Sequence, residues 1–136
     1  MQNRAVASFE VTGWDQLPPD NGGEGPVLSR ATVGKAFNGD LVGESTATLL
    51  MCQADTSELS AGAGYVASER FAGQLAGKQG TFVMQHWGVS EAGGQRTGGH
   101  VVPGSGTSDL AGLTGEVAIS VDADGAHTLT LDYEID

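Results

Sequence analysis

Apolar and polar residues alternate in short runs along most of this chain, and glycine, proline and asparagine stand between the runs. In the first run, residues 5–14, the side chains of Ala7, Phe9 and Val11 fall on one face and polar neighbours fall on the other. A period of two is the pattern of a half-buried β-strand. No comparable helical period recurs, so the sequence predicts an all-β fold.

The same alternation predicts about eight strands, at residues 5–14, 26–37, 41–53, 65–75, 81–89, 96–103, 116–121 and 127–134. We expect an exposed loop at residues 16–25, and the small, polar residues 54–64 would have room for one helical turn. Consecutive hairpins favour an eight-stranded antiparallel up-and-down barrel over a sandwich, because closure removes exposed sheet edges. A chain of 136 residues fits one domain, residues 1–136.

Turn residues also predict which strand residues face each other. A three-residue loop at 38–40 would pair Val33 with Ser45, in the same register that pairs Phe37 with Leu41 and Ala31 with Ala47. A turn at 123–125 would pair Val117 with Leu131 and Ile119 with Leu129. The glycine-rich residues 104–115 predict a sharp reversal of the chain, with Leu110 and Leu113 turned inward.

The chain is organised around the hairpin of residues 65–88. A turn centred between Gly77 and Lys78 would place Phe71 opposite Met84 and Glu69 opposite His86. Moving the turn by one whole residue changes the partners but leaves the same side chains on one face. That face carries aromatic and apolar groups around one acid–base pair: Tyr65, Glu69, Phe71, Phe82, Met84 and His86.

Charge and composition exclude several classes of partner. Six basic residues stand against seventeen acidic ones, for a net charge of −11. Nucleic-acid binding needs clustered lysine and arginine, and an anionic membrane would repel this chain. Cys52 is the one cysteine, so no intramolecular disulfide forms, and we expect a buried, inert thiol. The default expectation is a cytoplasmic protein that binds neither nucleic acid nor membrane.

Four segments together resemble the bacterial DUF3224 family: residues 35–43 (KAFNGDLVG), 69–73 (ERFAG), 80–88 (GTFVMQHWG) and 101–115 (VVPGSGTSDLAGLTG). That family is similar to the allene oxide cyclase barrels, which include the dirigent proteins. The resemblance implies an eight-stranded barrel of the allene oxide cyclase type, oligomeric, with a mostly apolar cavity. It also implies a protein that steers a small reactive molecule without a cofactor.

Glu69 and His86 are the candidate catalytic residues, because a carboxylate beside an imidazole in an apolar cavity can move a proton. The alternative is a structural pair, in which these two groups satisfy each other or Arg70 reaches Glu69. The candidate ligand-contacting residues are Tyr65, Phe71, Phe82, Met84, Met51 and Trp14. We expect no metal site, because His86, His100 and His127 lie on separate strands without ligand spacing.

Two functions remain open at this point. One is a cofactor-independent cyclase or isomerase that acts on a small apolar, polyene or enolisable substrate. The other is a non-catalytic barrel that binds a small apolar ligand. Trp87, Val83 and Val66 fall on the outward face in either case, and such a patch predicts a homodimer or homotrimer.

Overall fold

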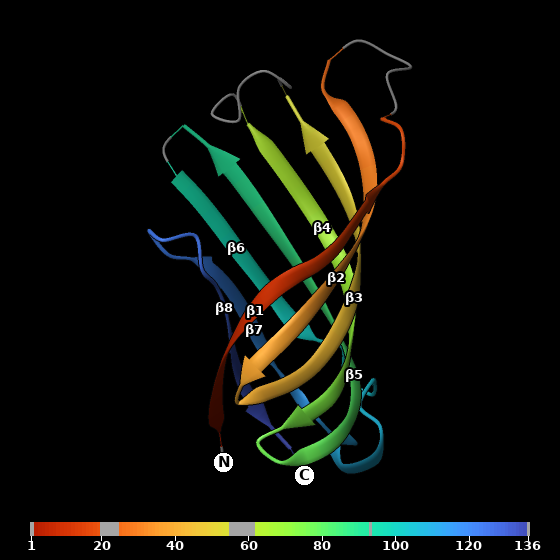
Figure 1. The fold of residues 1–136 in the computed structure, drawn as a ribbon, viewed down its shortest axis with the longest axis vertical. Helices are drawn as coiled ribbons and strands as arrows, with labels where there is room; N and C mark the ends of the chain where they lie inside the picture. The colour runs from red at the N-terminus through yellow and green to blue at the C-terminus, as the bar shows by residue number, and fades with distance from the viewer. Residues whose placement is uncertain (1, 20–24, 55–61, 93, 136) are drawn as a thin grey trace.

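The computed structural model describes residues 2–19, 25–54, 62–92 and 94–135, which form a closed antiparallel barrel (Figure 1). Each strand pairs with the next in the sequence, and β1 pairs with β8 to close the sheet. The strands are β1 (Asn3–Gln16), β2 (Val27–Gly39), β3 (Leu41–Gln53), β4 (Ala63–Leu75), β5 (Lys78–Glu91), β6 (Gly94–Val101), β7 (Thr114–Val121) and β8 (His127–Glu134). The predicted all-β, eight-stranded up-and-down barrel is confirmed.

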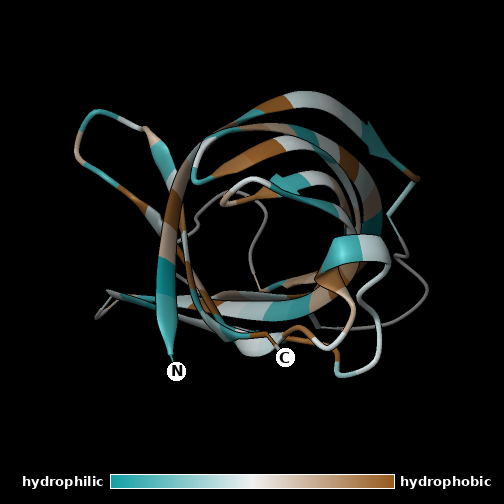
Figure 2. Cartoon of the chain, turned by 90° about the horizontal axis from the view of Figure 1, so that it is seen from below, coloured by the Kyte–Doolittle hydropathy of each residue, from teal (hydrophilic) through white to brown (hydrophobic). Residues whose placement is uncertain are grey.

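The lower end of the barrel, where the β2–β3 and β4–β5 turns lie, holds the main apolar core (Figure 1). Leu110 and Leu113, from the segment between β6 and β7, are both 0% exposed, as the sequence predicted. This segment contains the short 3-10 helix η2 (Ser108–Leu110), which packs against β5. Figure 2 shows it beside the ring of strands seen from below. Within the described residues, no helix is long and apolar enough to cross a membrane.

The β7–β8 hairpin has the predicted register, with Val117 opposite Leu131 and Ile119 opposite Leu129. The β2–β3 register was predicted wrongly by two residues: Phe37 pairs with Gly43.

In the same register Val33 pairs with Ala47 and Ala31 with Leu49. The residues after Phe37 do not form a tight loop, because they bond to β1. Gly39 pairs with Ala7, the Asp40 amide donates to the Val6 carbonyl at 3.1 Å, and the Val6 amide donates to Asp40 Oδ2 at 2.9 Å. A shift of two residues leaves the same side chains inside.

The central hairpin turns one residue earlier than predicted. Leu75 pairs with Lys78 across the two-residue loop Ala76–Gly77, so Phe71 faces Phe82 and Glu69 faces Met84. Both loop residues have positive φ, 50° for Ala76 and 86° for Gly77, as the twist of a two-residue hairpin demands. His86 consequently pairs with Ala67. The inward face nevertheless carries the predicted side chains.

A bulge in β1 changes which side chains point into the barrel. The register with β2 shifts between Val11 and Gly13, so that Trp14 lies opposite Val33. Val33 is buried inside the barrel, and directly paired residues share a face. Unbroken alternation from Ala7 and Phe9 would put Val11 inside and Trp14 outside. Val11 is instead 45% exposed, and Trp14, which is 53% exposed, lines the pocket at the upper end of the barrel.

Candidate functional site

A cluster of four polar side chains lies inside the barrel, above the lower core. It consists of Lys35 on β2, Ser45 on β3, Glu69 on β4 and His86 on β5, and we call it the polar cluster. The Glu69 carboxylate, which is 0% exposed, accepts all of its bonds from the other three. Oε1 accepts hydrogen bonds from Lys35 Nζ at 2.9 Å and from His86 Nε2 at 2.8 Å. Oε2 accepts one from Ser45 Oγ at 2.5 Å.

Lys35 and Ser45 were missed by the sequence analysis. Both follow from the alternation of their strands, since Lys35 shares a face with Val33 and Phe37, and Ser45 shares one with Ala47. A lysine on the inward face of a strand was the available signal. Because lysine is almost never fully buried unless it is paired, it indicated a buried acidic partner. The alternative partner considered for Glu69, Arg70, is exposed on the outward face of β4.

The surroundings of Glu69 decide its protonation. Burial raises the pKa of the carboxyl. The opposing effects are larger in sum: hydrogen bonds from His86, Ser45 and Lys35 and the charge of Lys35 together lower it from 4.5 to about 2. Lys35 Nζ also lies 4.6 Å from the centre of the Phe9 ring, a cation–π contact. Glu69 is therefore an ionised acceptor held by a buried counter-charge.

Tyr65 connects the polar cluster to the upper end of the barrel. Its hydroxyl lies 3.1 Å from Nδ1 of His86, which stands two residues before Gly88, the β5 residue that pairs with Tyr65. The ring crosses Gly88 to reach it: a Cβ on Gly88 would lie 2.5 Å from Cε1 of Tyr65. Burial, with a smaller contribution from the charge of Glu69, raises the pKa of the Tyr65 phenol.

Hydrogen-bond chemistry fixes the tautomer of His86. An ionised carboxylate accepts only, so Nε2 of His86 must carry the hydrogen that Glu69 receives. In the uncharged imidazole Nδ1 is then an acceptor, and the Tyr65 hydroxyl donates to it. Hydrogen bonds therefore run continuously from Tyr65 at the upper end, through His86 and Glu69, to Lys35.

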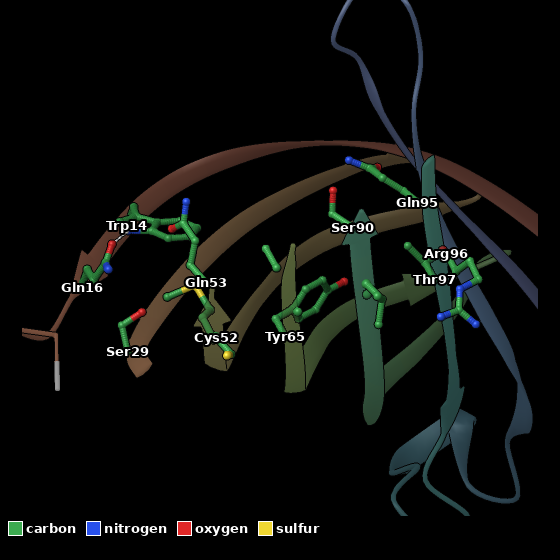
Figure 3. A pocket seen from close by; sticks show the side chains of 15 residues that line it. Trp14, Gln16, Ser29, Cys52, Gln53, Tyr65, Ser90, Gln95, Arg96 and Thr97 are labelled. Carbon is green, nitrogen blue, oxygen red and sulfur yellow. Dashed lines mark hydrogen bonds between the residues drawn. The ribbon is translucent and has the colours of Figure 1, made fainter. Parts of the chain in front are cut away.

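A pocket of about 380 Å³ occupies the upper end of the barrel, within the usual size of a small-molecule site. Its apolar lining includes Trp14, Met51 and Tyr65, and Trp14 Nε1 donates to Gln16 Oε1 at 3.2 Å. Figure 3 shows the lining side chains arranged from Trp14 and Gln16 on β1 to Thr97 on β6. The remaining lining includes one charged side chain, Arg96, and several uncharged polar groups: Gln16, Ser29, Gln53, Ser90, Gln95 and Thr97.

The structure divides the candidate residues between two regions. Tyr65, Met51 and Trp14 line the upper pocket, and Tyr65 joins them to Glu69 and His86. Phe71, Phe82 and Met84 share the inward face but belong to the lower core, where the Phe71 and Phe82 rings are 5.2 Å apart. These three lie outside the lining of the pocket.

The remaining histidines and the cysteine lie apart from the polar cluster. His100 is exposed, and His127 stacks on Phe9 with ring centres 5.1 Å apart. No group of three or more potential metal ligands occurs among the residues that the structure describes. Cys52, expected to be buried, is partly exposed and contributes to the pocket lining.

Comparison with known proteins places this barrel in a family. The model of a family described as "Protein of unknown function (DUF3224)" matches residues 5–133. The chain belongs to the DUF3224 family. A search of curated proteins finds no match. A crystal structure of a DUF3224 protein of unknown function from Shewanella oneidensis MR-1 superposes with a TM-score of 0.85.

That DUF3224 protein is 32% identical in sequence, and the match covers 100% of this chain and 99% of the other. The shared fold therefore extends over the whole barrel, including the strands that supply the polar cluster and the upper pocket.

Proposed function

We propose that this DUF3224 protein is a cofactor-independent isomerase or cyclase that binds a small apolar, enolisable molecule in the upper pocket. The observation that carries the proposal is the hydrogen bond between Tyr65 and His86, which joins a partly open pocket to an imidazole that is only 5% exposed. A basic group held at the base of an apolar pocket suits proton abstraction next to a carbonyl.

The proposed step is a proton relay. The substrate C–H bond breaks, its proton passes to the Tyr65 oxygen, and the Tyr65 proton passes to Nδ1 of His86. The C–H electron pair remains on the substrate as an enolate. Glu69 stabilises the imidazolium through Nε2, and concerted transfer avoids a free phenolate, which the raised pKa of Tyr65 disfavours. Return of the proton at another carbon completes an isomerisation.

Glu69 has a different part in this proposal from the one that the sequence suggested. Its pKa of about 2 makes it a poor base near neutral pH, so it acts as a positioning residue that fixes the His86 tautomer. Lys35 and Ser45 hold the carboxylate in turn. We also propose the finer relationship to the allene oxide cyclase barrels, supported by the closed eight-stranded topology and the glycine-rich residues 104–115.

The second candidate function is ligand binding without catalysis. The observation that favours it is the complete pairing of Glu69, because a carboxylate with a lysine, a histidine and a serine around it is also what a stable buried polar group requires. Under this alternative the upper pocket still binds an apolar molecule, but Tyr65 and His86 leave it chemically unchanged.

Binding and hydrogen exchange of 2-tetralone, a bicyclic enolisable ketone, distinguish the two candidates. Wild-type protein in deuterated buffer should bind the ketone and accelerate exchange at its α-carbon above the buffer rate, as followed by proton NMR. Binding without accelerated exchange would reject the catalytic function in favour of the binding alternative. Absence of binding to 2-tetralone and to other neutral aromatic probes would reject both.

A further inference from the structure

The single hydrogen of the Tyr65 hydroxyl determines what this residue can recognise in the upper pocket. A phenol has one O–H donor and two lone pairs. Because Nε2 of His86 is committed to Glu69, Nδ1 of the uncharged ring has to accept, and Tyr65 donates its hydrogen to it. The Tyr65 oxygen therefore has only lone pairs left for a molecule in the pocket.

The ring of Tyr65 has little freedom to change this arrangement. It lies against the backbone of Gly88, where even a methyl group would collide with it. Gly99, the strand partner of His86, provides the same close fit on the other side, since a Cβ there would lie 2.7 Å from Cβ of His86. Two glycines thus allow both rings to pack closely enough for the 3.1 Å contact.

We propose that Tyr65 is the specificity-determining residue of the upper pocket and selects ligands that carry an O–H donor, namely alcohols, phenols or the enol form of a ketone. This inference rests on the proposed function, since it concerns the same pocket. A ligand hydroxyl that donates to Tyr65 completes a chain of hydrogen bonds running from the ligand to Glu69.

Two probes of nearly equal shape test the selection. 2-Naphthol carries an O–H donor, and 2-methoxynaphthalene has a methyl group in place of that hydrogen. Their dissociation constants are measured by fluorescence with wild type, Tyr65→Phe and Tyr133→Phe. Tyr133 is the matched control, because it is the other tyrosine of the chain and lies in the lower core. Comparing ratios between variants cancels the different hydrophobicity of the probes.

The preference of wild type for 2-naphthol over 2-methoxynaphthalene should fall about 2- to 10-fold in Tyr65→Phe, the usual effect of one neutral hydrogen bond. It should stay unchanged in Tyr133→Phe. An unchanged ratio in Tyr65→Phe, with both probes bound, would overturn the inference and leave the pocket intact. A ratio that falls equally in both variants would overturn it as well. Failure of wild type to bind either probe would overturn the proposed function itself.

Discussion

At the scale of single residues, the stability of the fold and the proposed chemistry both depend on one buried carboxylate. Glu69 is ionised in the interior because Lys35, His86 and Ser45 surround it. Breaking such a buried pair by removing one partner is costly, because the other charge then lies unpaired in a dry environment. The polar cluster is therefore a structural element whatever the protein does in the pocket.

Acid unfolding tests this state of Glu69. A pKa lowered from 4.5 to about 2 means that ionisation of Glu69 stabilises the fold fully above about pH 4.5. This contribution, on the order of 3 kcal/mol, is lost as the pH falls toward about 2. Urea unfolding at a series of pH values should show a shallower loss of unfolding free energy over this range for Glu69→Gln than for wild type.

Glu44→Gln, which removes an exposed carboxylate from the outward face of β3, is the control for loss of one acidic group. If Glu69→Gln and wild type lose unfolding free energy in parallel between pH 4.5 and 2, Glu69 is not held ionised in the way described.

At the scale of elements, the segment between β6 and β7 joins the lower core to β5. The Thr107 amide donates to the Thr81 carbonyl at 2.9 Å, and the Val83 amide donates to Ser105 Oγ at 3.0 Å. Gly80 on β5 allows this approach, because a Cβ there would collide with the carbonyl oxygen of Thr107. These bonds fix the backbone from which Leu110 and Leu113 reach the core.

Leu110→Ala and Leu113→Ala should each lower the free energy of unfolding by about 2–5 kcal/mol, since both side chains are 0% exposed and their removal leaves a cavity. Chemical denaturation measures this effect. Leu17→Ala is the control, because Leu17 is 47% exposed. Equal free energies of unfolding for all three variants would contradict the description of the segment as a buried plug.

The elements were predictable from the sequence because alternation and turn residues are local signals. β3 (Leu41–Gln53) and β8 (His127–Glu134) have the predicted ends, and the β7–β8 register was correct. The two wrong registers depended on information that is not local. Ala76 adopts a positive φ that its residue type does not favour, and Asp40 bonds to β1 rather than closing a tight loop.

The site was predictable only in part for a similar reason. Alternation correctly put Glu69 and His86 on one inward face, and they bond directly. It could not identify Lys35 as the partner of Glu69, because Lys35 lies on β2 and β3 stands between that strand and β4. Their contact depends on the curvature of the closed barrel. The β1 bulge, which turns Trp14 into the pocket, likewise had no clear sequence signal.

At the scale of the whole molecule, the outward surface carries an apolar row across neighbouring strands. Leu50, Val66 and Trp87 pair in register on β3, β4 and β5, and each is at least 40% exposed. Leu28 on β2 is exposed close to them, and the four residues belong to the lining of one shallow outer hollow. Val83, predicted to join this face, is half-buried.

The outer apolar row predicts a homodimer or homotrimer in solution, because so continuous a patch is stabilised by contact with a second copy. Sedimentation velocity at micromolar concentration should show the oligomer for wild type and its dissociation in a Val66→Ser, Trp87→Ser double variant. Val42→Ser, which changes an exposed apolar residue at the other end of β3, should remain oligomeric. A monomeric wild type would refute the prediction.

The central claim is that the barrel uses His86, through Tyr65, to move protons on a molecule held in the upper pocket. The most direct test is the rate of α-hydrogen exchange of bound 2-tetralone in wild type, Tyr65→Phe, His86→Gln and the lower-core control Tyr133→Phe. We predict that the first two variants lose about 100- to 10,000-fold of the protein-dependent rate, the usual share of general acid–base catalysis, while Tyr133→Phe retains it. Exchange that is equally fast in His86→Gln, with the variant folded and the ketone bound, would contradict the account.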